Sequence, residues 1–285
     1  MGKRASPGSA PTSWLLRTNP RDAVPAVGVS ALGGDRKCGA ATGSADRRAC
    51  WNGSVGNDVR AGAISARVEA VWAASGAVAV ALFACGLLFG DLLATTNFPA
   101  LNATPSQLRE YFLRNVSEVR ALSFFHLLAA AALAAFASYL HARLRSIGIR
   151  VAALALTGGI IAAAFLAMSA LCYRVLAEHS VASDPALAHA LVVLSYLAGG
   201  PAIGVPLALT AGAFAAAIQH ESLPGWLYWL SIVAAVLGVA SATSMLGPTN
   251  NGSLVYGVLL LAAVLLFAWL VASSLVLVRR ARPPR

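Results

Sequence analysis

Three ionisable residues in or beside long apolar segments are the ones that could do chemistry in this sequence. Asp91, His126 and His189 each lie within about two helical turns of the end of an apolar run. Carboxylate and imidazole groups bind zinc and relay protons, and the cost of such groups inside a membrane suggests a function. Because no HxxxH or HExxH spacing accompanies them, hydrogen bonding at the membrane surface is the alternative. We predict no metal site, and we name all three as candidate ligand-binding residues.

A group of glycines and prolines interrupts the long apolar segment 185–218. It contains Gly200, Pro201 and Pro206 near the midpoint. Proline has no amide hydrogen, so backbone carbonyls one turn earlier lose their helical partners. In a membrane these carbonyls need other partners, and the broken helices of transporters use them to bind substrates. These three residues are therefore candidate ligand-binding residues too. The alternative is a kink that neighbouring helices and hydroxyl groups satisfy.

Motifs of common catalytic sites are absent from the sequence. It contains no GxSxG, no Walker loop and no acidic metal motif. Its four cysteines form no CxxC pair and have no zinc spacing, which argues against a metal cluster or a structural disulfide. We therefore predict a protein that is not an enzyme, with no catalytic residues and no cofactor.

Composition indicates that these residues are positioned by membrane-spanning helices. The chain is 58% hydrophobic and 11% charged, whereas soluble domains are about 25% charged. Spanning a bilayer takes about 20 apolar residues in a helix. We predict an all-α, polytopic membrane protein, a bundle of six transmembrane helices with a kinked fourth span. The predicted domain covers residues 71–278, with spans at about 71–96, 121–140, 151–172, 185–218, 226–246 and 254–278.

The two ends of the chain are basic and polar. Residues 1–70 are rich in Gly, Ala, Ser and Arg without an apolar period, so we expect a disordered tail. An alternative is that translation begins further in, at Val59 or Val68. Residues 279–285 form a short basic C-terminus.

Arginine placement predicts the orientation. Arg143, Arg145 and Arg150 lie between the second and third spans, and both ends of the chain are basic. Positive residues remain on the cytoplasmic side, so we place both termini in the cytoplasm of a bacterial cell, with the bundle in the inner membrane. The positive residues behind the net charge of +10 then set the topology and contact anionic lipid headgroups. The expected partner is the bilayer, not nucleic acid.

The first outer loop contains a predicted amphipathic helix. Thr104, Pro105 and Gln107 fit an N-cap, a proline in the first turn and a capping-box partner. Apolar residues then recur at three- and four-residue spacing from Leu108 onward, which is typical of a helix with one apolar face. We expect it on the outer membrane interface; a simple lead-in turn to the second span is the alternative.

Four segments resemble a known group of proteins. They are PSQLREYFLRN in the outer loop, FASYLHARLR at the exit of the second span, YLAGGPAIGVPLAL at the kink and LPGWLYWL before the fifth span. Over about residues 68–282 the chain resembles uncharacterised six-span membrane proteins of actinobacteria, the DUF4386-like family. The resemblance implies the six-span fold and brings no assigned reaction or site residue.

Three classes of function follow from these observations. The leading hypothesis is binding or passage of a small or lipidic ligand through the kinked bundle. The second is an interaction or scaffold protein without a ligand, and the third is a metal-dependent enzyme at the outer leaflet. A cavity reaching the kink favours the first, and clustered Asp and His side chains favour the third.

Overall fold

A computed structural model describes residues 44–91, 93–96, 98, 103–219, 223–246 and 254–281. Within these ranges, the side chains of residues 44–65, 91 and 254–256 are outside the description. Contacts divide the chain into two units, Met1–Ser54 and Val55–Arg285. Of the first unit only the helical residues 44–54 are described.

The regular structure of the described residues is helical throughout. The helices are α1 (Ser44–Asp91), α2 (Pro105–Arg114), α3 (Val116–Leu144), α4 (Ile149–Leu176), α5 (His179–Ala182), α6 (Pro185–Gly199), α7 (Pro201–Ile218), α8 (Gly225–Ala240), the 3₁₀ helix η1 (Ser241–Met245) and α9 (Leu254–Ala281).

Six helical segments are long and apolar enough to cross a membrane. They are Ala66–Gly90, Val116–Leu144, Ile149–Leu176, Pro185–Ile218, Gly225–Met245 and Gly257–Ala281. Each exceeds the roughly 20 residues that a span requires. The predicted all-α bundle of six spans is confirmed, and the chain is a multi-pass integral membrane protein.

The first helix differs from its predicted limits at both ends. It begins at Ser44, inside the segment expected to be disordered, and ends at Asp91 rather than Thr96. A helix extends readily from an existing one, because each added residue gains a hydrogen bond. It ends early because Thr95 turns toward Asn115, whose side-chain oxygen accepts bonds from the Thr95 amide and hydroxyl, both at 2.8 Å. Residues 1–43 lie outside the described part of the chain.

The fourth span consists of two helices joined at Gly200. Asp184 caps the first of them by accepting hydrogen bonds from the amides of Ala186 and Leu187, which confirms the predicted start. Gly200 leaves the helical conformation, with φ −109° and ψ −98°. A Cβ atom there would lie 2.9 Å from the carbonyl oxygen of Tyr196, so glycine suits the break.

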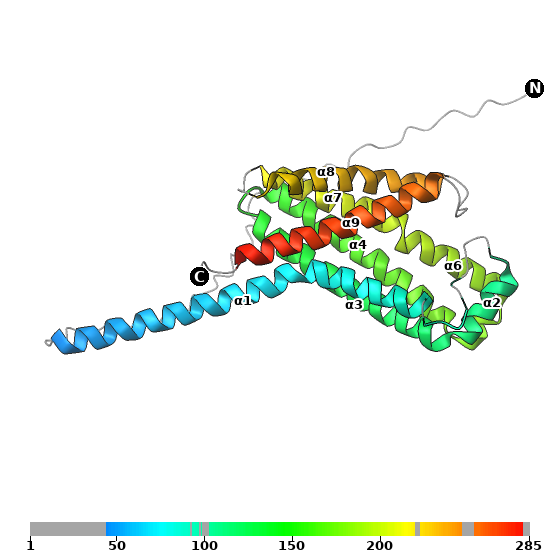
Figure 1. Cartoon of the computed structure of the whole chain (residues 1–285), viewed down its shortest axis with the longest axis horizontal. Coiled ribbons are helices and arrows are strands. Elements are labelled where there is room, and N and C mark those ends of the chain that lie inside the picture. Colours follow the sequence, from blue (N-terminus) through cyan, green and yellow to red (C-terminus); the bar gives the residue numbers. More distant parts are fainter. Residues whose placement is uncertain are drawn as a thin grey trace, which may run out of the picture. The chain divides into compact units, whose positions relative to one another are not determined.

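Helix α4 packs against both α3 and α7, which lie beside it in the bundle (Figure 1). Two adjacent glycines make this possible. A Cβ at Gly158 would lie 2.4 Å from the carbonyl oxygen of Pro206, and one at Gly159 would lie 2.3 Å from the Cβ of Ala137. Small residues let backbones approach in membranes, where van der Waals packing drives helix association. These two glycines therefore place the broken helix against the third span.

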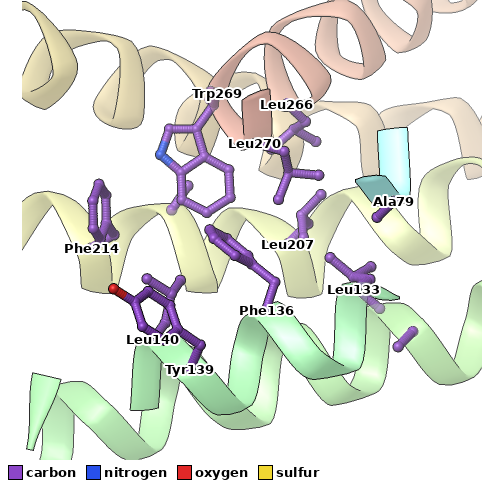
Figure 2. Close-up of a cluster of buried hydrophobic side chains, with 14 of the residues drawn as sticks. Ala79, Leu133, Phe136, Tyr139, Leu140, Leu207, Phe214, Leu266, Trp269 and Leu270 are labelled. Carbon is purple, nitrogen blue, oxygen red and sulfur yellow. The ribbon is translucent and has the colours of Figure 1, made fainter. Parts of the chain in front are cut away.

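Three large rings fill the part of the bundle toward the α3–α4 turn, and we call them the aromatic core. Trp269 of α9 is fully buried, with its ring centroid 6.3 Å from that of Phe136 and 6.0 Å from that of Phe214. Figure 2 shows the three rings among buried leucines. The Trp269 indole donates a 3.0 Å hydrogen bond to Ser231, so its one polar group is satisfied.

The loop between the first two spans holds the predicted capped helix. The Thr104 amide donates to the Gln107 side chain at 2.9 Å, and the Gln107 amide donates to the Thr104 hydroxyl at 3.4 Å. The capping box is therefore confirmed. Its apolar face differs from expectation, because Leu108 and Phe112 are fully buried and pack with residues of α4 and α6 such as Val192. Helix α2 closes the end of the bundle.

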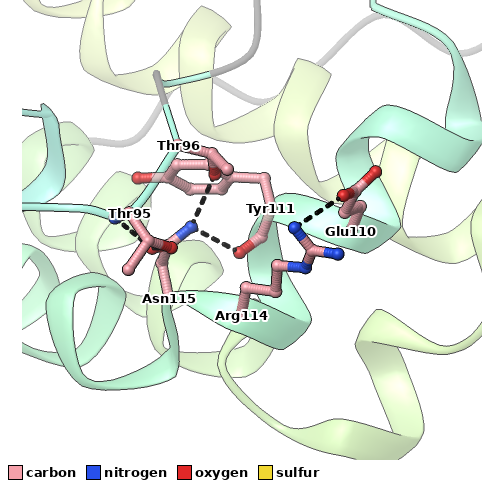
Figure 3. A network of polar contacts seen from close by, with 6 residues as sticks. All are labelled: Thr95, Thr96, Glu110, Tyr111, Arg114 and Asn115. Atoms are coloured by element: carbon pink, nitrogen blue, oxygen red, sulfur yellow. Dashed lines mark hydrogen bonds and ion pairs between the residues drawn. The ribbon is translucent and has the colours of Figure 1, made fainter.

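Buried Asn115 ties this loop to the end of the first span. Its side-chain nitrogen donates to the Thr96 hydroxyl at 2.9 Å and to the Tyr111 carbonyl at 3.0 Å. Figure 3 shows these bonds together with the ion pair of Glu110 and Arg114, which lies outside the network. The Tyr111 hydroxyl in turn donates to the carbonyl of Gly90. The end of α1, the end of α2 and the start of α3 are thereby held together.

Candidate ligand cavity

A cavity of about 510 Å³ lies beside the break in the fourth span. Residues of α1, α3, α4, α6, α7, η1 and α9 line it, including Gly199 and Gly200 at the break itself. The volume falls within the roughly 300–1,000 Å³ typical of small-molecule sites. The broken helix thus borders an internal space rather than a fully packed interface.

Most of the cavity wall is apolar. Phe83 and Phe267 contribute aromatic rings, and Leu133, Leu166 and Leu207 contribute aliphatic side chains. Among the described residues that line it, none is Lys, Arg, Asp or Glu. A charged ligand group would have no counter-ion here, and burying it unpaired would be costly. The wall therefore suits an uncharged, mostly hydrocarbon molecule.

His126 is the distinctive polar residue of the wall. Its side chain is buried, with 4% of the residue exposed, and its ring stacks on Phe83 at a centroid distance of 4.4 Å and an angle of 5°. The backbone of Phe83 lies near the ring, yet neither ring nitrogen completes a hydrogen bond. A buried polar group without a partner costs about 1–3 kcal/mol. Among the described residues that line the cavity, His126 is therefore the one whose buried side-chain nitrogens the protein leaves unsatisfied.

A glycine on the first span makes room for this imidazole. A Cβ at Gly86 would lie 2.8 Å from Cδ2 of His126 and 3.1 Å from its Nε2. Larger side chains at this position would push the ring away from α1. The glycine therefore allows an imidazole to be buried between the two spans.

The other polar groups near the break are bonded within the protein. The Ser169 hydroxyl donates to the Ser195 carbonyl at 2.9 Å, and the Ser195 hydroxyl donates to the Val192 carbonyl at 2.8 Å. The Tyr173 hydroxyl lies close to the Ser195 side chain. These bonds hold α4 to the last turns of α6, so they stabilise the shape of the cavity wall.

The cavity opens sideways between α1 and α9. Three of its lining residues are also exposed: Leu87 by 49%, Leu260 by 49% and Val264 by 62%. All three are apolar and belong to membrane-spanning segments. The opening therefore faces the region that lipid chains occupy.

The structure brings two of the six predicted site residues to this cavity, His126 and Gly200. Pro201 and Pro206 are buried in α7 without lining it, and the Pro206 carbonyl accepts a 3.3 Å hydrogen bond from Thr210. The same hydroxyl also donates to the Ala155 carbonyl of α4 at 3.2 Å. The alternative of a kink that neighbouring helices and hydroxyl groups satisfy stays a prediction.

The remaining two predicted residues are His189 and Asp91. His189 is exposed on α6 and is not among the lining residues. Asp91 is the last residue of α1, and its side chain lies outside the described part. Within the described ranges, no group of three or more His, Cys, Asp or Glu side chains is arranged to hold a metal ion. The predicted cluster at the outer rim is therefore not assembled by the described side chains.

Sequence reasoning missed the contribution of α4 to the wall. Leu166, Ser169 and Tyr173 all line the cavity, and their spacing of three and four residues places them on one helical face. The sequence did contain an indication of this face, because Ser169 and Tyr173 are polar residues four apart in an apolar segment. Phe83, which stacks on His126, had no distinguishing pattern.

Comparison of the chain with protein-family models, with curated proteins and with solved structures gave no match. The resemblance to six-span actinobacterial membrane proteins therefore stays a prediction. The cavity itself carries the functional argument.

Proposed function

We propose that this integral membrane protein binds an uncharged lipidic ligand in the cavity beside Gly200. The observation that carries the proposal is His126, a buried imidazole with no hydrogen-bond partner on the wall of an apolar cavity of about 510 Å³. A bound hydroxyl or carbonyl group would satisfy it, because a neutral imidazole has one donor and one acceptor nitrogen. The hydrocarbon part of the ligand would lie against Phe83 and Phe267.

The lateral opening supports a lipidic rather than a water-soluble ligand. Leu87, Leu260 and Val264 form an apolar mouth within the spans. A ligand dissolved in the bilayer reaches such a mouth without crossing water. Binding, without catalysis, is the function that this wall supports.

Photolabelling tests the proposal on the purified protein. The probe is a long-chain fatty alcohol carrying a diazirine, competed with the unlabelled alcohol. We expect saturable labelling of cavity-lining peptides of α1, α3 or α9. Ile203→Trp should abolish it, because Ile203 lines the cavity and a larger ring would fill the space. The matched control is Leu209→Trp, an exposed position of the same helix that does not line the cavity.

Both variants are compared only after gel filtration and melting curves match those of the wild type. Labelling that persists in Ile203→Trp would overturn the proposal and favour the alternative, an interaction or scaffold protein without a ligand. A charged fatty acid probe that labels the cavity as strongly as the alcohol would contradict the uncharged class.

We also propose the orientation and location predicted from the arginines. Both termini would lie in the cytoplasm and the bundle would cross a bacterial inner membrane, because Arg143 and Arg145 lie at the turn between α3 and α4. Reporter fusions after residue 115 and after residue 281 test this. The first should report the outer side and the second the cytoplasm.

A further inference from the structure

A second hollow lies on the surface of the bundle, next to the proposed ligand site, with which it shares the lining residues Val80 and Phe267. It is a shallow groove of about 510 Å³ along α9, bordered by Val80 of α1 and Trp226 of α8. One face of α9 forms its floor, from Phe267 to Arg279. We call it the α9 groove.

The length of the α9 groove matches one leaflet of a bilayer. Ala268, Val271, Leu275 and Arg279 recur at three- and four-residue spacing, so they lie along one face. From Ala268 to Arg279 the helix rises about 16 Å at about 1.5 Å per residue. The hydrocarbon core is roughly 30 Å thick, so half of it is about the same length. The groove therefore runs from near the midplane to one membrane surface.

The surface end of the groove carries a positive charge. Arg279 is exposed in the last turn of α9, and the ion pairs of the described residues do not include it. No Asp or Glu is among the groove's described lining residues. Trp226, which is 54% exposed at the start of α8, borders the groove, and tryptophan favours the level of lipid headgroups.

We infer that the α9 groove binds one anionic phospholipid, with its phosphate at Arg279. The guanidinium matches a phosphate group through paired hydrogen bonds, and an acyl chain would lie along Leu275 and Val271 toward the midplane. The positive charge of Arg279 favours a lipid with net negative charge over a zwitterionic one. The chain end would reach Val80 and Phe267, which also line the internal cavity.

Native mass spectrometry of the purified full-length protein tests this inference. The probes are phosphatidylglycerol and phosphatidylcholine with identical chains. We expect the first phosphatidylglycerol to bind more tightly than phosphatidylcholine. Arg279→Gln should weaken that binding by about fivefold or more, whereas the matched control Arg280→Gln should leave it close to wild type. Equal loss in the two variants would show a diffuse charge effect and overturn the assigned site.

A second variant tests the groove without touching the charge. Ala268 is exposed and lines the groove, so Ala268→Trp should block the acyl chain and weaken phosphatidylglycerol binding. The control is Leu261→Trp, an exposed position of α9 that lines neither hollow. Unchanged binding in Ala268→Trp would overturn the inference. Neither Arg279→Gln nor Ala268→Trp should alter labelling of the cavity by the diazirine alcohol. A failure of the phospholipid inference can therefore be told apart from a failure of the proposed ligand site.

Discussion

The aromatic core and the ligand cavity are built from the same helices, yet one is filled and the other is not. Helix α3 contributes Phe136 to the aromatic core and His126 to the cavity. Helix α9 contributes Trp269 to the core, where the indole is bonded to Ser231. The imidazole of His126 has no such partner. A buried polar group that the protein itself satisfies supports packing, and one left open beside a cavity is suited to a ligand.

Residue size explains where the space remains. Three large rings occupy the core, whereas Gly199, Gly200 and Gly204 line the cavity. In the core the rings fill the distance between helices. At the break these three glycines have no side chains to fill the space beside Gly200. The comparison predicts different responses to substitution in the two regions.

Trp269→Ala should have the largest effect. Removing a fully buried aromatic side chain costs about 3–5 kcal/mol of unfolding free energy, and packing losses of this kind also apply in a bilayer. The loss of unfolding free energy is measured by unfolding the protein in mixed micelles. Trp229→Ala is the control because Trp229 is 66% exposed. If both variants lost the same small amount of unfolding free energy, the distinction between a filled aromatic core and an open cavity would not hold.

Gly158→Ala should have the next largest effect. The added methyl group would meet the Pro206 carbonyl oxygen and the Thr210 backbone, so α4 and α7 must separate. Overpacking costs about 1–3 kcal/mol of unfolding free energy. In Gly212→Ala the nearest atom would be the Ala235 Cβ at 3.9 Å, so this control should be neutral or slightly stabilising. If the two variants melt alike, close packing at Gly158 is not what holds the broken helix.

His126→Leu should leave stability unchanged or raise it by up to about 1 kcal/mol, because it removes an unsatisfied buried polar group. The same variant should lose labelling by the diazirine alcohol. Melting temperature and labelling are measured on one preparation. A strong loss of stability would assign His126 to packing and remove the contrast with Trp269.

Glu178 should show the smallest effect, because it lies outside both regions. The Arg174 side chain donates a hydrogen bond to it and, with a smaller contribution from Arg120, holds the pKa of this carboxyl below its ordinary value of 4.5. Because the pKa is lower in the folded than in the unfolded protein, the ionised carboxylate stabilises the fold at pH values above the ordinary pKa. This stabilisation is lost as the pH falls through the folded-state pKa.

A comparison with Glu178→Gln measures this effect. The wild type should melt slightly higher at pH 7, and the difference should disappear in acid. A difference that grows as pH falls would contradict the sign. Since about half of the carboxyl side chain is exposed, the effect on stability should be smaller than those of Trp269→Ala and Gly158→Ala.

Several features can be predicted from the sequence alone, because they depend on interactions between residues that are close together in the chain. Apolar length predicts six spans, because a helix must cross about 30 Å of hydrocarbon. Thr104 with Gln107, and Asp184, predict helix starts because their side chains accept bonds from amides a few residues away. Gly200 followed by Pro201 predicts the break. Each of these depends on neighbours within one turn of the chain.

Which polar residues meet was decided only by the tertiary structure. The buried stripe of α6 contains Ala188, Val192 and Ser195, and His189 lies about 100° away from it, on the exposed side. The buried stripe of α3 contains His126. A membrane helix is apolar on every face, so its sequence does not show which face the bundle will bury. That choice depends on helix partners far along the chain, and here it left one imidazole beside an apolar cavity.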